Sequence, residues 1–71
     1  MMRISGTVKF MRRDYGFIIR GDTGCDIFVH SRDVVDDATL SEGDRVSFIE
    51  AKSRDGRPCA KEVALILQAR S

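Results

Sequence analysis

The chain has 71 residues, of which 42% are hydrophobic and 32% are charged, with a net charge of +1. This length holds one small domain, and the composition excludes a disordered chain. No apolar run approaches the roughly 20 residues of a membrane-spanning helix. The first residues lack the apolar segment of a secretion signal, so we expect a cytoplasmic protein that does not enter a membrane.

The charges are unevenly distributed along the chain. Residues 1–20 carry a net charge of +4, residues 21–50 carry −6, and residues 51–71 carry +3. A polyanion could therefore bind the two basic ends if the fold brings them together.

The first predicted strand runs from Ile4 to Met11. Its alternation of apolar and polar residues breaks after Lys9, where Phe10 and Met11 follow in succession. Such a break indicates a β-bulge that turns one of the two outward. We expect Phe10 to be the outward residue, with Met11 as the alternative.

The second and third predicted strands run from Tyr15 to Gly21 and from Cys25 to His30, joined by a turn at residues 22–24. In a strand, residues i and i+2 share a face. We expect one face of this strand pair to form the core, through Ile18, Ile27 and Val29. The opposite face then presents a histidine and three aromatic rings to water: His30, Tyr15, Phe17 and Phe28. A row of exposed rings is typical of a surface that binds a flat ligand.

The remaining chain predicts a short helical turn capped by Ser31, an acidic loop over residues 36–43 and two more strands. Val46, Phe48 and Glu50 share a face in the fourth strand. The last strand is expected from Cys59 to Leu67, after a turn at residues 53–56. A helix over residues 60–69 is the competing interpretation, because several residues there favour helices. Five short strands separated by turns indicate an all-β sandwich or barrel.

The two cysteines, Cys25 and Cys59, lie far apart and form no zinc-binding motif, so we expect free thiols and no metal. A disulfide is the alternative. His30 has no nucleophile partner, and no glycine-rich phosphate loop is present. We therefore expect neither an enzyme nor a cofactor or small-molecule substrate.

Five stretches resemble the bacterial cold shock proteins and the related cold-shock domain. They occur in the family's order and cover nearly the whole chain. They are residues 6–10 (Gly-Thr-Val-Lys-Phe), 15–18 (Tyr-Gly-Phe-Ile), 26–30 (Asp-Ile-Phe-Val-His), 39–48 (Thr-Leu-Ser-Glu-Gly-Asp-Arg-Val-Ser-Phe) and 58–63 (Pro-Cys-Ala-Lys-Glu-Val).

The resemblance implies a single domain over residues 1–71, folded as a five-stranded antiparallel barrel of the OB type. It also implies a surface that binds single-stranded DNA or RNA. Phe10 stands where the family has a stacking tryptophan, and His30 stacks or donates a hydrogen bond beside the other rings. The implied nucleic-acid-binding residues are Lys9, Phe10, Arg12, Arg13, Tyr15, Phe17, Phe28, His30 and Arg57.

The chain also departs from the family pattern in ways that predict weaker binding over a shorter stretch of strand. The segment between Val8 and Gly16 is two residues shorter, and Asp14 adds a negative charge beside the rings. Ser31 replaces a frequent phenylalanine, and the acidic loop lacks an aromatic residue. Each stacked base contributes about 1–3 kcal/mol, so two missing rings matter.

Two functions remain open at this point. The first is a single-stranded nucleic-acid-binding protein that acts as an RNA chaperone or antiterminator. The second is a barrel that serves as a regulatory or protein-interaction module with weak nucleic-acid affinity. The sequence leaves open whether DNA or RNA is the target. It predicts a monomer, with a strand-exchanged dimer as the alternative.

Overall fold

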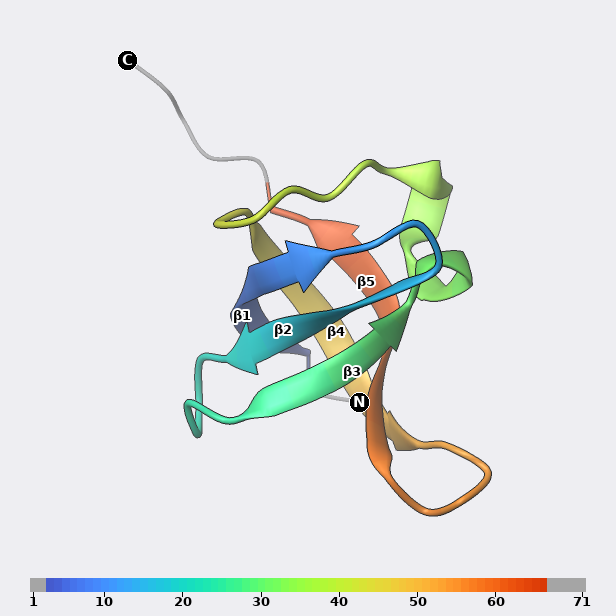
Figure 1. Ribbon diagram of the computed structural model, residues 1–71. Helices are drawn as coiled ribbons and strands as arrows, with labels where there is room; N and C mark the ends of the chain where they lie inside the picture. Colours follow the sequence, from blue (N-terminus) through green and yellow to red (C-terminus); the bar gives the residue numbers. More distant parts are fainter. Residues whose placement is uncertain (1–2, 67–71) are drawn as a thin grey trace.

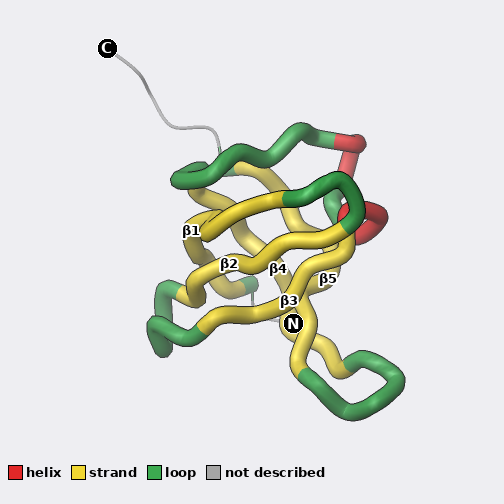
Figure 2. The backbone as a smooth tube through the Cα atoms, viewed as in Figure 1, coloured by secondary structure: helices red, strands yellow, loops and turns green. Residues whose placement is uncertain are grey.

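Within residues 3–66, which the computed structural model of this chain describes, five strands curl into a closed barrel (Figure 1). The expected all-β barrel is therefore confirmed. Two short 3₁₀ turns, η1 and η2, join the third strand to the fourth (Figure 2). The elements are β1 (Ile4–Met11), β2 (Tyr15–Arg20), β3 (Asp26–His30), η1 (Ser31–Asp33), η2 (Val35–Asp37), β4 (Arg45–Lys52) and β5 (Pro58–Leu65).

The strand order around the barrel is β1-β2-β3-β5-β4, with β4 pairing back to β1. Every pair is antiparallel except β3 and β5, which run parallel where Phe28 faces Cys59 and Val29 faces Ala60. The sequence-based expectation of antiparallel pairing is therefore wrong at this one pair. An odd number of strands cannot alternate direction all the way round a closed ring, so one neighbouring pair must be parallel.

The predicted bulge in β1 is present, and Lys9 is its extra residue. Val8 lies opposite Ile18, and Phe10 already lies opposite Phe17, so the register shifts between them. Phe10 therefore faces outward beside Phe17, whereas Met11 packs against the core. The bulge decides which of the two apolar residues is available to a ligand.

Aliphatic side chains and one phenylalanine fill the barrel. The expected core residues Ile18, Ile27 and Val29 are fully buried, as is Phe48 of β4. Gly6 is also buried, and a Cβ atom there would lie 2.6 Å from the Ile19 carbonyl oxygen. Glycine at this position allows β1 and β2 to approach closely. The rest of the core is formed by Val8, Val34, Leu40, Val46, Ala60 and Val63.

The expected cap of the first helical turn is wrong by one residue. η1 begins at Ser31, and the preceding residue, His30, caps it. The imidazole Nδ1 of His30 accepts a hydrogen bond of 3.2 Å from the backbone amide of Arg32. The Ser31 amide donates to the Asp14 carbonyl oxygen, which ties η1 to the β1–β2 turn.

The last element is a strand from Pro58 to Leu65, so the competing helix is wrong for the described part of residues 60–69. The expected end at Leu67 lies outside the described residues.

Glu62 adopts a positive φ of 49° where the register between β4 and β5 shifts. The Arg3 guanidinium donates to the Glu62 carbonyl oxygen at this irregularity. β2 ends one residue earlier and β3 begins one residue later than expected.

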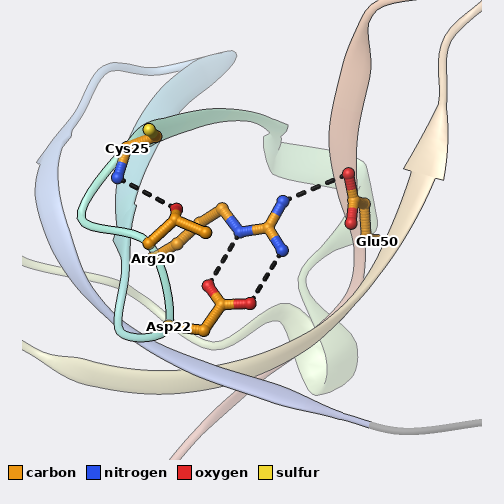
Figure 3. Close-up of polar contacts among 5 residues, drawn as sticks. Arg20, Asp22, Cys25 and Glu50 are labelled. Atoms are coloured by element: carbon orange, nitrogen blue, oxygen red, sulfur yellow. Dashed lines mark hydrogen bonds and ion pairs between the residues drawn. The ribbon is translucent and has the colours of Figure 1, made fainter.

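An ion-pair cluster joins β2 to β4, two strands that are not hydrogen-bonded neighbours (Figure 3). The Arg20 guanidinium lies 2.9 Å from Asp22 Oδ2 and 3.1 Å from Glu50 Oε2, and its side chain is only 15% exposed. The hydrogen bond to Asp22 raises the pKa of Arg20 above its ordinary value. The same bond lowers the pKa of Asp22.

Cys25 is exposed and Cys59 is buried, and both are free thiols, as expected. No helix among residues 3–66 is long and apolar enough to cross a membrane.

Candidate nucleic-acid interface

Four aromatic rings lie together on the outer face of β1, β2 and β3, and we call them the aromatic platform: Phe10, Tyr15, Phe17 and Phe28. Phe17 lies at its centre, with its ring centroid 5.6 Å from Phe10, 6.5 Å from Tyr15 and 5.8 Å from Phe28. The three strands hold the rings in place because Phe10 pairs with Phe17 and Phe17 pairs with Phe28 across the sheet. The structure thus brings together the three rings that the strand periodicity predicts and Phe10, which the predicted bulge turns outward.

The platform is open to solvent although its members are apolar. Tyr15 is 41% exposed and Phe28 is 37% exposed, while Phe10 and Phe17 are half-buried. Leaving apolar area in water forgoes about 25 cal/mol per Å² of stabilisation. Contiguous exposed apolar surface of this kind marks an interaction site more often than a structural one.

His30 extends the platform along β3, where it pairs with Tyr15. Its ring is half-buried, and Nδ1 is occupied by the hydrogen bond from the Arg32 amide. In the neutral ring, Nε2 therefore carries the proton and is the donor available to a ligand. One side chain both caps η1 and borders the platform.

Two of the four sequence-predicted cations form ion pairs with aspartates at the edges of the platform. Lys9 Nζ lies 2.8 Å from Asp26 Oδ2, and Arg57 Nε lies 3.4 Å from Asp55 Oδ2. Hydrogen bonds from the Ser53 hydroxyl and the Arg57 amide lower the pKa of Asp55, which favours its charged form. Exposed ion pairs stabilise a fold by only about 0–1 kcal/mol, so a phosphate group can displace either carboxylate.

The other two predicted cations lie at the β1–β2 turn. Arg12 is placed over the Phe10 ring, with its Cζ atom 5.2 Å from the ring centroid. Arg13 is exposed and makes no ion pair within residues 3–66. Arg12 is thus part of the platform's border, while the structure records no contact between Arg13 and the rings.

Two clefts flank Phe28, and sequence reasoning anticipated neither. The first, of about 360 Å³, is lined by Phe17, Asp26, Phe28, Ser53, Asp55, Arg57, Pro58 and Cys59. The second, of about 570 Å³, is lined by Phe28, His30, Arg32, Asp33, Lys52, Ser53, Arg54, Cys59 and Lys61.

Four cations in the second cleft, Arg32, Lys52, Arg54 and Lys61, are absent from the sequence-predicted set. For Lys52, Arg54 and Lys61 the net positive charge of residues 51–71 was the available signal, but strand periodicity does not say which strand β5 lies beside. Ile19 is a further exposed residue outside the sequence-predicted set, and it lies on the same side of β2 as Tyr15 and Phe17.

A family model for the 'Cold-shock' DNA-binding domain matches residues 4–66. The chain belongs to the cold-shock domain family. Members of this family bind single-stranded nucleic acids. The cold-shock domain described here has a cluster of aromatic side chains on its surface. The expected family, the OB-type barrel and the exposed aromatic surface are thus confirmed.

Curated relatives agree with this assignment. A cold shock-like protein of Aquifex aeolicus is 41% identical over 69 residues, covering 92% of this chain and 97% of that protein. The cold shock-like protein CspA of Vibrio cholerae is 36% identical over 67 residues, covering 89% and 96%. Cold shock protein 1 of Lactiplantibacillus plantarum is 40% identical over 62 residues, covering 83% and 94%.

The solved structure of Drosophila Unr CSD456 supports the fold alone. It superposes on this cold-shock domain with a TM-score of 0.80 at 21% sequence identity. The match covers 93% of this chain and 27% of the Drosophila chain.

Proposed function

We propose that this cold-shock domain binds single-stranded DNA or RNA by stacking successive bases on the aromatic platform and His30. The observation that carries the proposal is the contiguity of four rings on one exposed face while aliphatic side chains and a single phenylalanine, Phe48, fill the core. Lys9, Arg12 and Arg57 border this face and contact the phosphate backbone in the proposed complex, and Arg13 of the β1–β2 turn is a further phosphate contact there.

Stacking explains why the ligand is a single strand. Every base has a flat face, so rings bind bases with little sequence preference, at about 1–3 kcal/mol for each stacked base. In a duplex the bases already stack on their neighbours and pair with the other strand. A duplex therefore offers phosphates but no free base faces to the platform.

The biological action follows from binding alone, without bond chemistry. A protein that holds unpaired segments lowers the stability of hairpins in the same strand. This is the action of an RNA chaperone or an antiterminator, and we assign it to a cytoplasmic monomer. The four rings and His30 offer few stacking positions, so we expect a short footprint.

A second candidate is a regulatory or protein-interaction module with weak nucleic-acid affinity. The pairing of Lys9 with Asp26 and of Arg57 with Asp55 favours it, because these carboxylates reduce the positive charge beside the rings. Asp14 is exposed in the β1–β2 turn and acts in the same direction.

A titration with a short oligothymidylate distinguishes the two functions. Tyr15 is the only tyrosine and the chain has no tryptophan, so its fluorescence reports directly on the platform. We expect saturable binding that weakens with salt, with a log–log slope of about 0.7 per neutralised phosphate, and no comparable quenching by a matched duplex. If the fluorescence and the amide shifts stay unchanged at high micromolar protein, the nucleic-acid-binding function is contradicted and the second candidate is favoured.

Ring-deletion variants complete the test. Phe17→Ala and Phe28→Ala should each bind several-fold to a hundredfold more weakly while keeping the far-ultraviolet circular dichroism of the folded barrel. Val35→Ala is the matched control, because Val35 is an exposed apolar residue in η2, away from the platform strands. Equal affinities for all three variants would contradict stacking.

A further inference from the structure

The second of the two clefts beside Phe28 has a basic lining that the platform lacks. We call it the basic cleft and define it by Arg32, Lys52, Arg54 and Lys61, with Phe28 and His30 at its border. Arg32 belongs to η1, Lys52 ends β4, Arg54 lies in the β4–β5 turn and Lys61 lies in β5. Residues from both sides of the β3–β5 pairing therefore line one cleft. The β4–β5 hairpin, which carries Arg54, projects from the barrel (Figure 1).

Most of the positive charge in the basic cleft is not neutralised. Lys61 Nζ lies 3.3 Å from both carboxylate oxygens of Asp33. Within residues 3–66, the side chains of Arg32, Lys52 and Arg54 have no carboxylate within 4.0 Å. One carboxylate and four cations leave an excess of positive charge, and a concave surface concentrates its field.

The cations beside the platform differ from those of the basic cleft because two of them are already paired with carboxylates. Lys9 and Arg57 already have aspartate partners at 2.8 Å and 3.4 Å, so an incoming phosphate must compete for them. A phosphate that enters the basic cleft meets three cations, Arg32, Lys52 and Arg54, without such competition. The favourable electrostatic site therefore lies past Phe28, beside the stacking surface.

The basic cleft is continuous with the stacking surface. Phe28 lines both clefts, and His30 contributes to the platform's edge and to the basic cleft. A base that stacks on Phe28 therefore lies at the border of the basic cleft. Beyond His30, η1 consists of Ser31, Arg32 and Asp33, so it presents charge and no ring to the next nucleotide.

We propose that the basic cleft binds consecutive phosphodiester groups of the single strand where the strand leaves Phe28. This inference rests on the proposed function and adds the direction in which the strand continues. It divides the interface into a stacking part on β1–β3 and an electrostatic part between η1 and the β4–β5 hairpin. Arg32 and Lys52 act from opposite walls on the same stretch of backbone.

The test compares the salt dependence of oligothymidylate binding in the wild type and in the double variant R32Q/K52Q. Each lost phosphate contact reduces the log–log slope by about 0.7 for single strands, so two lost contacts reduce it by about 1.4. Between 50 and 200 mM salt, the wild type should then lose about 7-fold more affinity than the variant. The fluorescence change of Tyr15 at saturation should be the same in both proteins, because the stacking part is intact.

Arg45→Gln is the matched control. Arg45 is exposed, has no ion-pair partner within residues 3–66 and begins the strand that Lys52 ends. The length of β4 separates the two residues by roughly 20 Å. We expect the Arg45→Gln slope to equal that of the wild type. If Arg45→Gln lowers the slope as much per charge removed as R32Q/K52Q does, the effect is one of net charge and the proposal is overturned.

Oligonucleotide length provides a second measurement. Lengthening the strand beyond the platform should raise the affinity of the wild type more than that of R32Q/K52Q, and inorganic phosphate alone should not quench Tyr15. Wild-type binding with an unchanged slope in R32Q/K52Q would refute the basic cleft and leave the stacking function standing. No binding by the wild type would refute both.

Discussion

Tyr15 and Phe28 stack with their ring planes 16° apart and their centroids 6.0 Å apart, although they lie diagonally on neighbouring strands. Phe17 meets both rings edge-on, at interplanar angles of 90° and 76°. The platform therefore offers two nearly parallel rings around one that is turned across them. Two substitutions of Tyr15 separate the contribution of its ring from that of its hydroxyl group.

Tyr15→Phe should keep most of the affinity for oligothymidylate, whereas Tyr15→Ala should lose about 1–3 kcal/mol of binding free energy. The reason is that in the proposed complex the ring face, and not the hydroxyl group, contacts the base. Isothermal titration calorimetry measures both variants without relying on the tyrosine signal. A loss in Tyr15→Phe as large as that in Tyr15→Ala would show that a hydrogen bond, and not stacking, dominates at this position.

Phe10→Trp should tighten binding by several-fold, because a larger ring covers more of the base. Phe10 is outward and lies beside Phe17, so the indole replaces it without entering the core. The new tryptophan fluorescence should be quenched on adding oligothymidylate. Unquenched fluorescence at saturation would place residue 10 outside the contact surface.

Asp26→Asn should increase the affinity for single strands by several-fold at low salt. The substitution frees Lys9 for phosphate and removes a negative charge from the first cleft. Both partners are exposed, so the free energy of unfolding should change by no more than about 1 kcal/mol. Chemical denaturation measures the free energy of unfolding, and a titration at two salt concentrations measures the affinity. A lower affinity would mean that the Asp26 carboxylate itself binds the ligand.

Arg20→Gln should destabilise the barrel and lower Tm by about 5 °C, because it removes charge-assisted hydrogen bonds to Asp22 and Glu50. Nucleic-acid affinity at low temperature should be unchanged, since the cluster is formed by side chains outside the platform. Thermal unfolding followed by circular dichroism measures the first effect. Wild-type Tm in this variant would contradict the stabilising role of the cluster.

The same cluster makes stability depend on pH in the acid range. Arg20 lowers the pKa of Asp22 below its ordinary value of 3.8, so the folded state binds that proton less readily than the unfolded state. The stabilisation is present above the unfolded pKa and is lost as the pH falls through the folded pKa. Unfolding titrations between pH 5 and pH 2 should show a shallower loss in Arg20→Gln than in the wild type.

Strand periodicity predicted the part of the structure that depends on neighbouring residues. Ile18, Ile27 and Val29 face the core because alternate residues in a strand share a side, and Tyr15 and Phe28 then face water. The bulge at Lys9 was likewise visible as a break in the alternation. Local spacing determines these features, whatever the strands pair with.

Features that depend on the closure of the barrel could not be predicted in this way. The pairing of Lys9 with Asp26, and the position of Arg32 and Lys52 in one cleft, require knowledge of which strands lie side by side. The cap by His30 depends on a one-residue difference in where η1 begins. The parallel pairing of β3 with β5 follows from an odd strand number in a closed ring, and the sequence pattern does not show closure.

The parallel β3–β5 ladder is the shortest in the barrel. Regions with few pairing residues open most readily in local unfolding. Opening at this ladder would part the walls that carry Arg32 and Lys52, while the platform rings stay on the intact β1–β3 meander. A strand bound across both walls would therefore hold the barrel shut, and hydrogen exchange at the Ala60 amide of β5 would slow more than exchange at the β1–β2 pairing.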